Sequence, residues 1–259
     1  MAGQAWTELE TKLALYLYFQ LTFGQLDQRN PEVIKLASLI GRTPSSVAMK
    51  LANIASLDPK ITQSGRKGLQ GASAQDRRIW DVFHADWTGL VTEIEDVLAE
   101  QNDRLRSGRV KEEAVPFNFE RYGEQTTKQA VVEVRVGQQF FRSAVLANFE
   151  GRCCVTGIAE ASLLIASHIV PWSDDTKNRH NSANGLSLSA TFDRAFDKGL
   201  MTIDPNLRVV LSPKLLHHEN EQTRGYFAPF GGRKILFPIR FLPDPELLDW
   251  HNKSVFEGA

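Results

Sequence analysis

The sequence predicts an α+β protein in two parts, a helical domain over residues 1–105 and a mixed domain over residues 128–259, joined by a linker at 106–127. Apolar residues recur at helical spacing through the first part, whereas the second part alternates short extended segments with helical ones. A polar, charged stretch interrupted by Pro116 separates them, as is typical of a domain boundary. At 259 residues the chain is long enough for two modest domains, each with its own core.

The first three predicted helices open with capping signals. The first has Thr7 as a plausible N-cap and Glu10 three residues later, the pattern of a capping box. The next two, over 30–41 and 43–57, each begin with a cap residue followed by Pro, and the earlier one ends at Gly41. Because only the short connection "GRT" joins them, this pair predicts a helix-turn-helix, a motif that is also common in ordinary helical bundles.

Charge is concentrated near this pair. Between Arg29 and Arg78 the chain carries nine basic and three acidic residues, although its overall formal charge is -1. This distribution fits a phosphate-binding surface, and a solvated charged face is the alternative. The basic tract 58–78 is expected to form either a hairpin-like wing or a mobile loop. The residues predicted to contact DNA in this domain are Arg42, Ser45, Ser46, Met49, Lys50, Arg66 and Lys67.

The remaining elements follow from periodicity. One long helix is expected over 77–101, with His84 in a structural role. The second half is expected to contain a strand at 129–137, a helix at 138–151, a strand and turn at 152–158, an apolar strand at 162–172, a polar loop, and a helix from about Ser189 to Gly199.

Four short segments carry a resemblance to a known family. In order along the chain they are "CCVTG", "ASHIVPW", "NGLSL" and "FDKG". This series resembles the HNH endonucleases, especially a branch common in bacterial restriction proteins, over about residues 136 to 211. The resemblance implies that the C-terminal domain is a ββα-metal (HNH) nuclease domain. It further implies that His168 is the general base and that Asn184 ties the loop to the strand and orients that base.

The chemistry of phosphodiester cleavage agrees with these assignments. A histidine that is neutral near pH 7 can take a proton from water, and a divalent cation can neutralise charge on the phosphate. Asp193 on the predicted helix offers the oxygen ligand that Mg²⁺ or Mn²⁺ prefers. Asp197, one turn later, is either a second ligand or a structural anchor that pairs with Arg194 or a backbone donor, and the anchor is favoured. Ser167 stands where the wider superfamily often has a metal-binding Asp, so few protein ligands are expected.

Several other residues near the motif are given smaller roles. Lys177 and Arg179 are candidates for a phosphate clamp, with solvated loop charges as the equal alternative. His180 is expected to be a loop residue near the entrance of the active site, and Trp172 to pack in the core. The two cysteines are adjacent at Cys153 and Cys154, which speaks against a disulfide between them and against a structural zinc site.

The resemblance and the layout together predict a metal-dependent DNA endonuclease. The arrangement is similar to restriction enzymes that cut 5-methylcytosine DNA, in which a winged-helix-like reader precedes an HNH domain. A methyl group would be read by an apolar contact, so Val47, Ala48 and Met49 are candidate readers. Cutting both strands of double-stranded DNA implies a homodimer. The alternatives are an HNH enzyme that cuts unmodified DNA or nicks it, and a helix-turn-helix regulator with an inactive nuclease-like domain.

Other classes of protein are disfavoured by composition. No apolar run approaches the roughly 20 residues needed to cross a bilayer. The N-terminal "MAGQAWTELE" lacks the basic and then apolar pattern of a signal peptide. A reducing cytoplasm is therefore the expected setting, and the resemblance implies a bacterial one.

Overall fold

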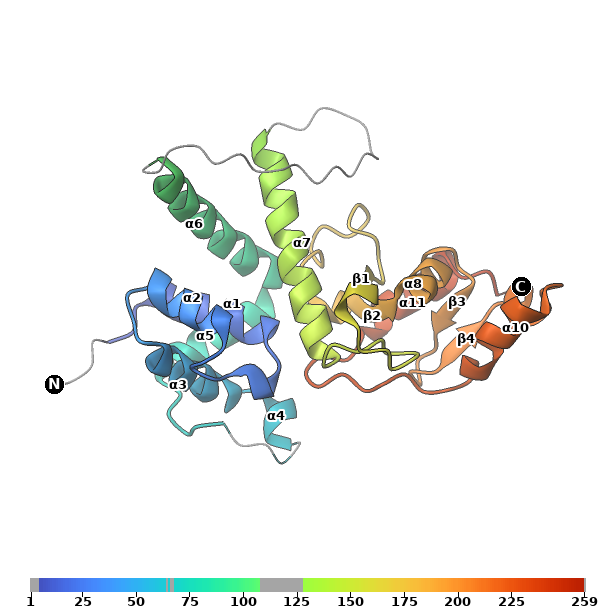
Figure 1. The fold of residues 1–259 in the computed structure, drawn as a ribbon, viewed down its shortest axis with the longest axis horizontal. Helices are drawn as coiled ribbons and strands as arrows, with labels where there is room; N and C mark the ends of the chain where they lie inside the picture. Colours follow the sequence, from blue (N-terminus) through green and yellow to red (C-terminus); the bar gives the residue numbers. More distant parts are fainter. Residues whose placement is uncertain (1–4, 64, 66–67, 108–127, 259) are drawn as a thin grey trace.

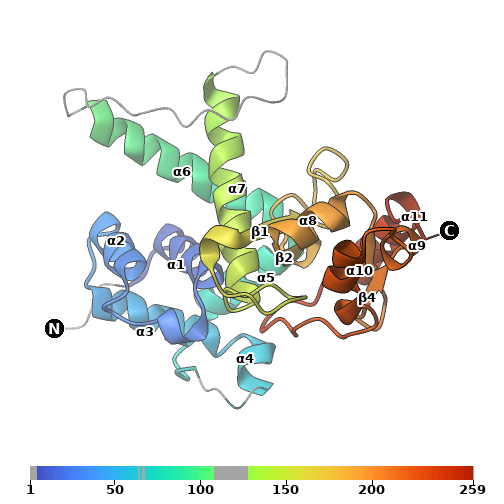
Figure 2. The ribbon, with the colours of Figure 1, turned by 45° about the vertical axis from the view of Figure 1, so that its right-hand side comes forward.

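The computed structural model describes residues 5–63, 65, 68–107 and 128–258. A helical N-terminal body and a mixed α+β C-terminal body lie on either side of helix α7 (Figures 1 and 2). Among the helices that the structure describes, none has the length and apolar character needed for a bilayer crossing. The elements are α1 (Glu8–Gln20), η1 (Phe23–Gln25), α2 (Pro31–Leu39), α3 (Pro44–Ala55), α4 (Pro59–Gln63), α5 (Ala74–Ala85), α6 (Trp87–Ser107), α7 (Lys128–Asn148), η2 (Ala161–Leu163), β1 (Leu164–His168), η3 (Ser182–Asn184), β2 (Gly185–Ser189), α8 (Ala190–Asp197), β3 (Met201–Ile203), β4 (Val209–Leu211), α9 (Pro213–Leu216), α10 (Glu221–Phe227), η4 (Ala228–Phe230) and α11 (Pro245–Ser254).

The predicted starts of the N-terminal helices are present. Thr7 and Glu10 form the capping box of α1, and Asn30 and Thr43 cap α2 and α3 ahead of a proline. Gly41 sits in the turn between α2 and α3 with a φ of 67°, a left-handed conformation that glycine adopts without strain. The two helices pack on each other and on α1. Their use as a DNA-binding motif stays a prediction.

Two expectations for this domain are corrected. The tract after α3 forms the short helix α4, and no strand occurs in its described part, so the structure has no hairpin wing there. The single long helix expected over 77–101 is divided into α5 and α6 at Asp86. Its backbone leaves the helical region (φ -147°, ψ 84°), and its carboxylate accepts a hydrogen bond from Gly89 N at 2.8 Å. The Asp86 side chain therefore starts the new helix, as capping carboxylates do.

Helix α7 replaces a predicted strand. The alternating segment at 129–137, expected to be extended, belongs instead to one continuous helix that ends at Asn148. Phe140 lies in the N-terminal core, whereas the next residue, Phe141, lies in the C-terminal core. Consecutive helical residues point about 100° apart, so a helix that is apolar on two sides can serve two bodies. Burial on two sides is seen at Phe140 and Phe141, and the alternating segment before them belongs to the same helix.

The C-terminal body is organised around an antiparallel hairpin followed directly by a helix. β1 pairs with β2 in a register that sets His168 opposite Gly185. α8 then begins one residue after β2, with Ser189 as its N-cap, as the sequence predicts. A side chain at Gly185 would come within 2.3 Å of Val145 on α7, so glycine allows the close approach of hairpin and helix. β3 and β4 form a second, separate hairpin that the sequence pattern does not predict.

The strand expected at 152–158 is a hydrogen-bonded turn. Cys153 N donates to Ile158 O at 2.8 Å, and Gly157 N donates back to Cys153 O at 2.9 Å. Cys154 N continues to Ser187 O of β2 at 2.7 Å. Both cysteines are free and fully buried, as expected of small apolar residues.

A segment from the C-terminal body locks the two bodies together. Arg240 is 3% exposed, and its Nη2 donates to Leu21 O, at the end of α1, at 2.7 Å. Its guanidinium lies 4.3 Å from the ring centroid of Tyr18 and 3.6 Å from the carboxylate of Asp58. The backbone of this segment is held in turn by Asn148, whose Oδ1 accepts from Arg240 N at 3.0 Å. The bodies are therefore joined by α7 and by a buried cation.

Candidate active site

One cleft collects three of the side chains that the sequence singles out in the C-terminal domain, His168, Asp193 and Asp197. It has a volume of about 480 Å³ and runs along β1 and α8. His168 reaches it from the end of β1, and Asp193 and Asp197 reach it from α8. The hairpin makes this convergence possible because β2 pairs with β1 and then leads directly into α8.

The imidazole of His168 is held in a single orientation. Its ring stacks on Phe141 of α7 with centroids 3.6 Å apart and planes 8° apart. Its Nε2 lies 3.1 Å from Arg179 O. A carbonyl oxygen only accepts hydrogen bonds, so Nε2 carries the proton and the lone pair of the neutral ring is on Nδ1. Burial lowers the pKa of His168 below its ordinary value, and the hydrogen bond to Arg179 offsets part of this effect. Because the pKa stays below its ordinary value, the ring is neutral near pH 7.

Asn184 lies behind the cleft and does not line it. The side chain is fully buried, and its Oδ1 accepts from Val170 N at 2.8 Å. Its Nδ2 donates to Val170 O at 3.1 Å and to Asn178 O at 3.2 Å. The amide thus ties the loop between β1 and β2 to Val170, two residues after the end of β1, and its role in orienting His168 stays a prediction.

The two carboxylates of α8 are one helical turn apart on the cleft. Burial raises the pKa of Asp193, and burial together with the charge of Asp193 raises the pKa of Asp197. No hydrogen bond or ion pair in the described part of the chain joins Asp197 to Arg194 or to a backbone donor. The direct contact favoured from the sequence as an anchor is therefore not seen in the described residues, although the charge of Arg194 lowers the pKa of Asp197 somewhat. Asp197 is exposed as a residue, and its carboxylate is partly desolvated beside Asp193.

These donors fit a hard divalent cation with few protein ligands. Ser167 Oγ is buried without a hydrogen-bond partner, and it lies near enough to Asp193 to lower the pKa of that carboxyl while falling outside hydrogen-bond geometry. No group of three or more His, Cys, Asp or Glu side chains is placed to hold a metal in the residues that the structure describes. Mg²⁺ and Mn²⁺ accept one or two carboxylates and fill the remaining positions with water and phosphate oxygens. Asp193 and Asp197 match that requirement.

The basic loop residues have different environments. Arg179 is half-buried, with its Nε donating to Trp172 O at 3.1 Å and its guanidinium 5.3 Å from the Trp172 ring. Lys177 is exposed, and its backbone carbonyl accepts a hydrogen bond from Thr88 of α6. Arg179 therefore holds the loop together, whereas the Lys177 ammonium remains open to solvent.

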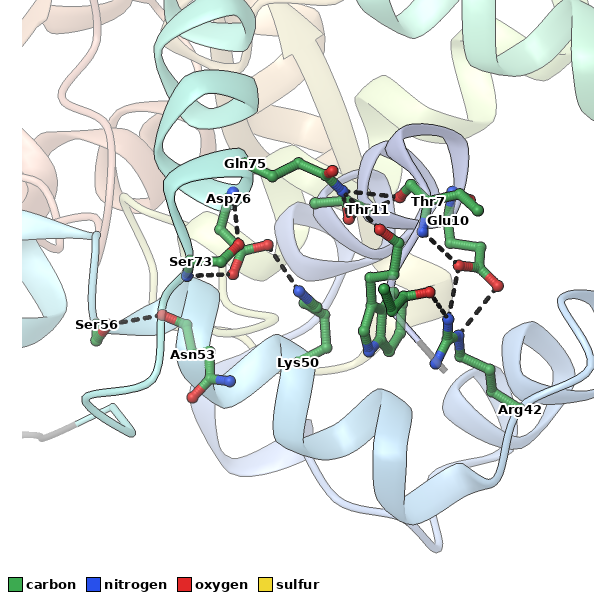
Figure 3. Close-up of polar contacts among 12 residues, drawn as sticks. Thr7, Glu10, Thr11, Arg42, Lys50, Asn53, Ser56, Ser73, Gln75 and Asp76 are labelled. Atoms are coloured by element: carbon green, nitrogen blue, oxygen red, sulfur yellow. Dashed lines mark hydrogen bonds and ion pairs between the residues drawn. The ribbon is translucent and has the colours of Figure 1, made fainter. Parts of the chain in front are cut away.

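Two of the DNA contacts predicted in the N-terminal domain form ion pairs. Lys50 is 7% exposed and donates to Asp76 at 2.7 Å. Arg42, in the turn between α2 and α3, donates to both carboxylate oxygens of Glu10 on α1, at 3.0 and 2.8 Å (Figure 3). The expectation that Lys50 faces a DNA groove is therefore wrong, whereas Arg42 is half-buried and its contact with DNA stays a prediction. The sequence pattern that assigns Lys50 to the exposed side of α3 does not reveal that Asp76 of α5 covers and pairs with this lysine.

The rest of the predicted α3 surface is partly available. Ser45 is exposed, Ser46 is half-buried, and Met49 is 55% exposed. Val47 is fully buried, so it is not a candidate reader of a methyl group, and Ala48 is half-buried. The remaining two, Arg66 and Lys67, lie outside the described residues.

Some side chains near the cleft have environments that the sequence does not reveal. Trp172, expected in the core, is half-buried and lines the cleft, as do Arg194 and Lys198. Helical spacing from Arg194, four residues earlier, is the signal that could have found Lys198. His251 of α11 also lies against the cleft, bonded to Thr202 Oγ1 at 2.9 Å. His180, expected at the entrance, is buried instead.

A comparison with known protein families finds that residues 153–204 match the HNH endonuclease family. The matched segment includes His168, Asn184 and both α8 carboxylates. A search of curated proteins finds no match. The C-terminal half of this α+β chain thus contains an HNH endonuclease domain, which indicates a nuclease acting on DNA.

Proposed function

We propose that this protein is a Mg²⁺- or Mn²⁺-dependent DNA endonuclease in which His168 is the general base. One observation carries the proposal: the oriented, neutral imidazole of His168 lines the same cleft as Asp193 and Asp197. Phosphodiester hydrolysis needs a proton acceptor and positive charge at the phosphate, and these residues supply the first and can hold the second.

The residues of the chain then have distinct tasks. His168 Nδ1 accepts a proton from a water molecule as the water oxygen bonds to phosphorus and the bond from phosphorus to the 3′ oxygen breaks. The Arg179 carbonyl and the Phe141 ring keep the imidazole aimed at that water. Asp193 and Asp197 would hold the cation. When bound, the cation supplies positive charge that polarises the phosphate and stabilises the leaving oxygen.

The test compares His168→Ala with a matched histidine variant. His217 is exposed and lies away from the cleft, so His217→Ala is the control. We expect His168→Ala to lower the rate of plasmid cleavage in Mg²⁺ by about 10²- to 10⁴-fold, the usual contribution of a general base. His217→Ala should cleave like the wild type. Full metal-dependent cleavage by His168→Ala would refute the assignment of the base.

A finer part of the proposal concerns the substrate. We infer a restriction-type enzyme acting as a homodimer in the bacterial cytoplasm and directed to 5-methylcytosine in double-stranded DNA. Its support is the layout, a helical domain ahead of an HNH domain, and the exposed Met49 on α3, which is suited to an apolar methyl contact. Digestion of methylated and unmethylated copies of one plasmid tests it, since equal cutting would contradict modification dependence.

A further inference from the structure

His180 is a buried histidine whose ring nitrogens are both unused. The side chain is 6% exposed, and neither Nδ1 nor Nε2 has a hydrogen-bond partner among the residues that the structure describes. Its ring packs edge to face on Trp172, with centroids 5.2 Å apart and planes 82° apart. Burial, together with the charges of Arg179 and His168, lowers the pKa of His180 to about 4, so the ring is neutral at working pH. Since its nitrogens make no hydrogen bonds to the described residues, the ring contributes by packing against its neighbours.

The space for this ring is provided by a glycine on α7. A Cβ at Gly137 would lie 2.3 Å from His180 Nε2, far inside van der Waals contact. Gly137 is buried and lies four residues before Phe141, so both are on the same face of the helix. Phe141 stacks on the ring of His168. One face of α7 thus receives the loop histidine and, one turn later, the imidazole at the active site.

The position of His180 is coupled covalently to the orientation of His168. The carbonyl that accepts from His168 Nε2 belongs to Arg179, and the peptide plane that contains this carbonyl also contains the N and Cα atoms of His180. A displacement of the His180 backbone therefore moves the acceptor. Among the loop's other side-chain hydrogen bonds, Asn184 donates to Val170 and Asn178 and the Nε of Arg179 donates to Trp172, so neither side chain bonds to the peptide unit between Arg179 and His180.

We propose that His180 is a positioning residue for His168, and that it works by packing into the gap left by Gly137 on α7. The inference rests on the proposed function, because it assigns His168 the task of a base. The packed ring fixes the Arg179 carbonyl, and that carbonyl fixes which nitrogen of His168 carries the proton. The substitution of a similarly sized apolar side chain should preserve this role, and an added methyl at position 137 should disturb it.

The test is a set of four variants: Gly137→Ala, His180→Ala, His180→Leu and the double variant Gly137→Ala/His180→Ala. Kinetics of plasmid cleavage in Mg²⁺ are measured as separate kcat and KM values. We expect Gly137→Ala and His180→Ala each to lower kcat by about 10- to 100-fold with little change in KM, as misplacement of a catalytic group does. His180→Leu should retain most of kcat. The double variant should be faster than Gly137→Ala alone, because the clash is gone.

A matched control separates the clash from a general effect of alanine in a helix. A Cβ at Gly225 of α10 would meet no neighbouring atom within 4 Å, so Gly225→Ala should leave kcat unchanged. Wild-type kcat in Gly137→Ala, or loss of kcat in His180→Leu equal to that in His180→Ala, would overturn the proposal.

A spectroscopic measurement distinguishes this inference from the proposed function. Imidazole ¹⁵N shifts report the tautomer of His168 whether or not the protein cleaves DNA. The wild type and His180→Leu should show the Nε2–H form, and Gly137→Ala and His180→Ala should show a mixture. If these shifts appear but no preparation cuts DNA, the positioning contact stands and the nuclease assignment fails. An unchanged His168 tautomer in the folded variants would overturn the positioning role.

Discussion

The buried carboxyl group of Glu95 makes a quantitative prediction about stability. Glu95 of α6 is 7% exposed, and its Oε1 accepts from the hydroxyl of Tyr16 on α1 at 3.4 Å. The Tyr16 ring in turn stacks on Phe140 of α7 at 4.6 Å, so the carboxyl lies where three helices meet. Burial raises the pKa of Glu95 from 4.5 to about 8, with a smaller contribution from the charge of Asp96.

The magnitude follows from the difference between the folded and unfolded pKa values. The unfolded chain releases the Glu95 proton above pH 4.5, while the folded protein retains it until about pH 8. Stability contributed by the neutral carboxyl is thus present below pH 4.5 and lost as the pH rises through 8. At about 1.4 kcal/mol per pKa unit, the wild type loses roughly 1 kcal/mol by pH 5 and about 3 kcal/mol by pH 7.

Glu95→Gln removes this dependence, because an amide of nearly the same shape does not titrate. In urea unfolding, the free energy of unfolding of Glu95→Gln minus that of the wild type should increase by about 3 kcal/mol between pH 5 and pH 8. The control is Glu93→Gln on the same helix, whose exposed ion pair with Lys12 contributes on the order of 1 kcal/mol or less. A difference for Glu95→Gln that is the same at both pH values would refute the reasoning.

Three further variants, each measured by urea unfolding, test two buried cations and one buried neutral histidine. Arg240→Ala should lower the free energy of unfolding by about 3 to 5 kcal/mol, because the Asp58 carboxylate is left buried without its cation. A cost below about 1 kcal/mol would contradict the role of Arg240 in joining the two bodies. Lys50→Ala should also lower the free energy of unfolding by about 3 to 5 kcal/mol, because the Asp76 carboxylate is left buried without its cation. A variant that is equally stable but binds DNA more weakly would show that Lys50 is a DNA contact after all. His251, with a pKa lowered by burial to about 4, stabilises the protein above pH 6.5 and loses that contribution as the pH falls through 4. The cost of His251→Gln should therefore shrink by about 2 kcal/mol between pH 7 and pH 4.5, and a constant cost would contradict it.

The features of the fold that the sequence predicts correctly are those set by neighbouring residues. Helix caps are such features, because the residues that form them lie within one helical turn of each other. Examples are the capping box of Thr7 and Glu10, the prolines that follow Asn30 and Thr43, and Gly41 between α2 and α3. The strand that carries His168 and the helix starting after Ser189 are also predicted, although the strand spans 164–168 instead of the expected 162–172. In each case the cause of the structure lies within a few residues of its effect.

The incorrect expectations concern residues whose partners are far away in the sequence. Alternation before Phe140 predicts a strand, but the segment is part of a helix that buries Phe140 in one core and Phe141 in the other. Helical spacing assigns Lys50 to a DNA groove, but Asp76 of α5 buries it. The loop position of His180 is predicted, but its packing against Gly137 of α7 is not. Propensity and spacing carry no information about such contacts.

The sequence by itself determined which chemical groups are available: a histidine at the end of an apolar strand, an asparagine in the next loop, and two aspartates one turn apart on the following helix. The tertiary structure alone decided how those groups are used. It stacks His168 on Phe141 and bonds its Nε2 to the Arg179 carbonyl, which selects the nitrogen that accepts a proton. The physical reason is that the tautomer of a histidine and the burial of its ring depend on atoms brought together through space. A helix cap or a helical spacing depends only on residues close together along the chain.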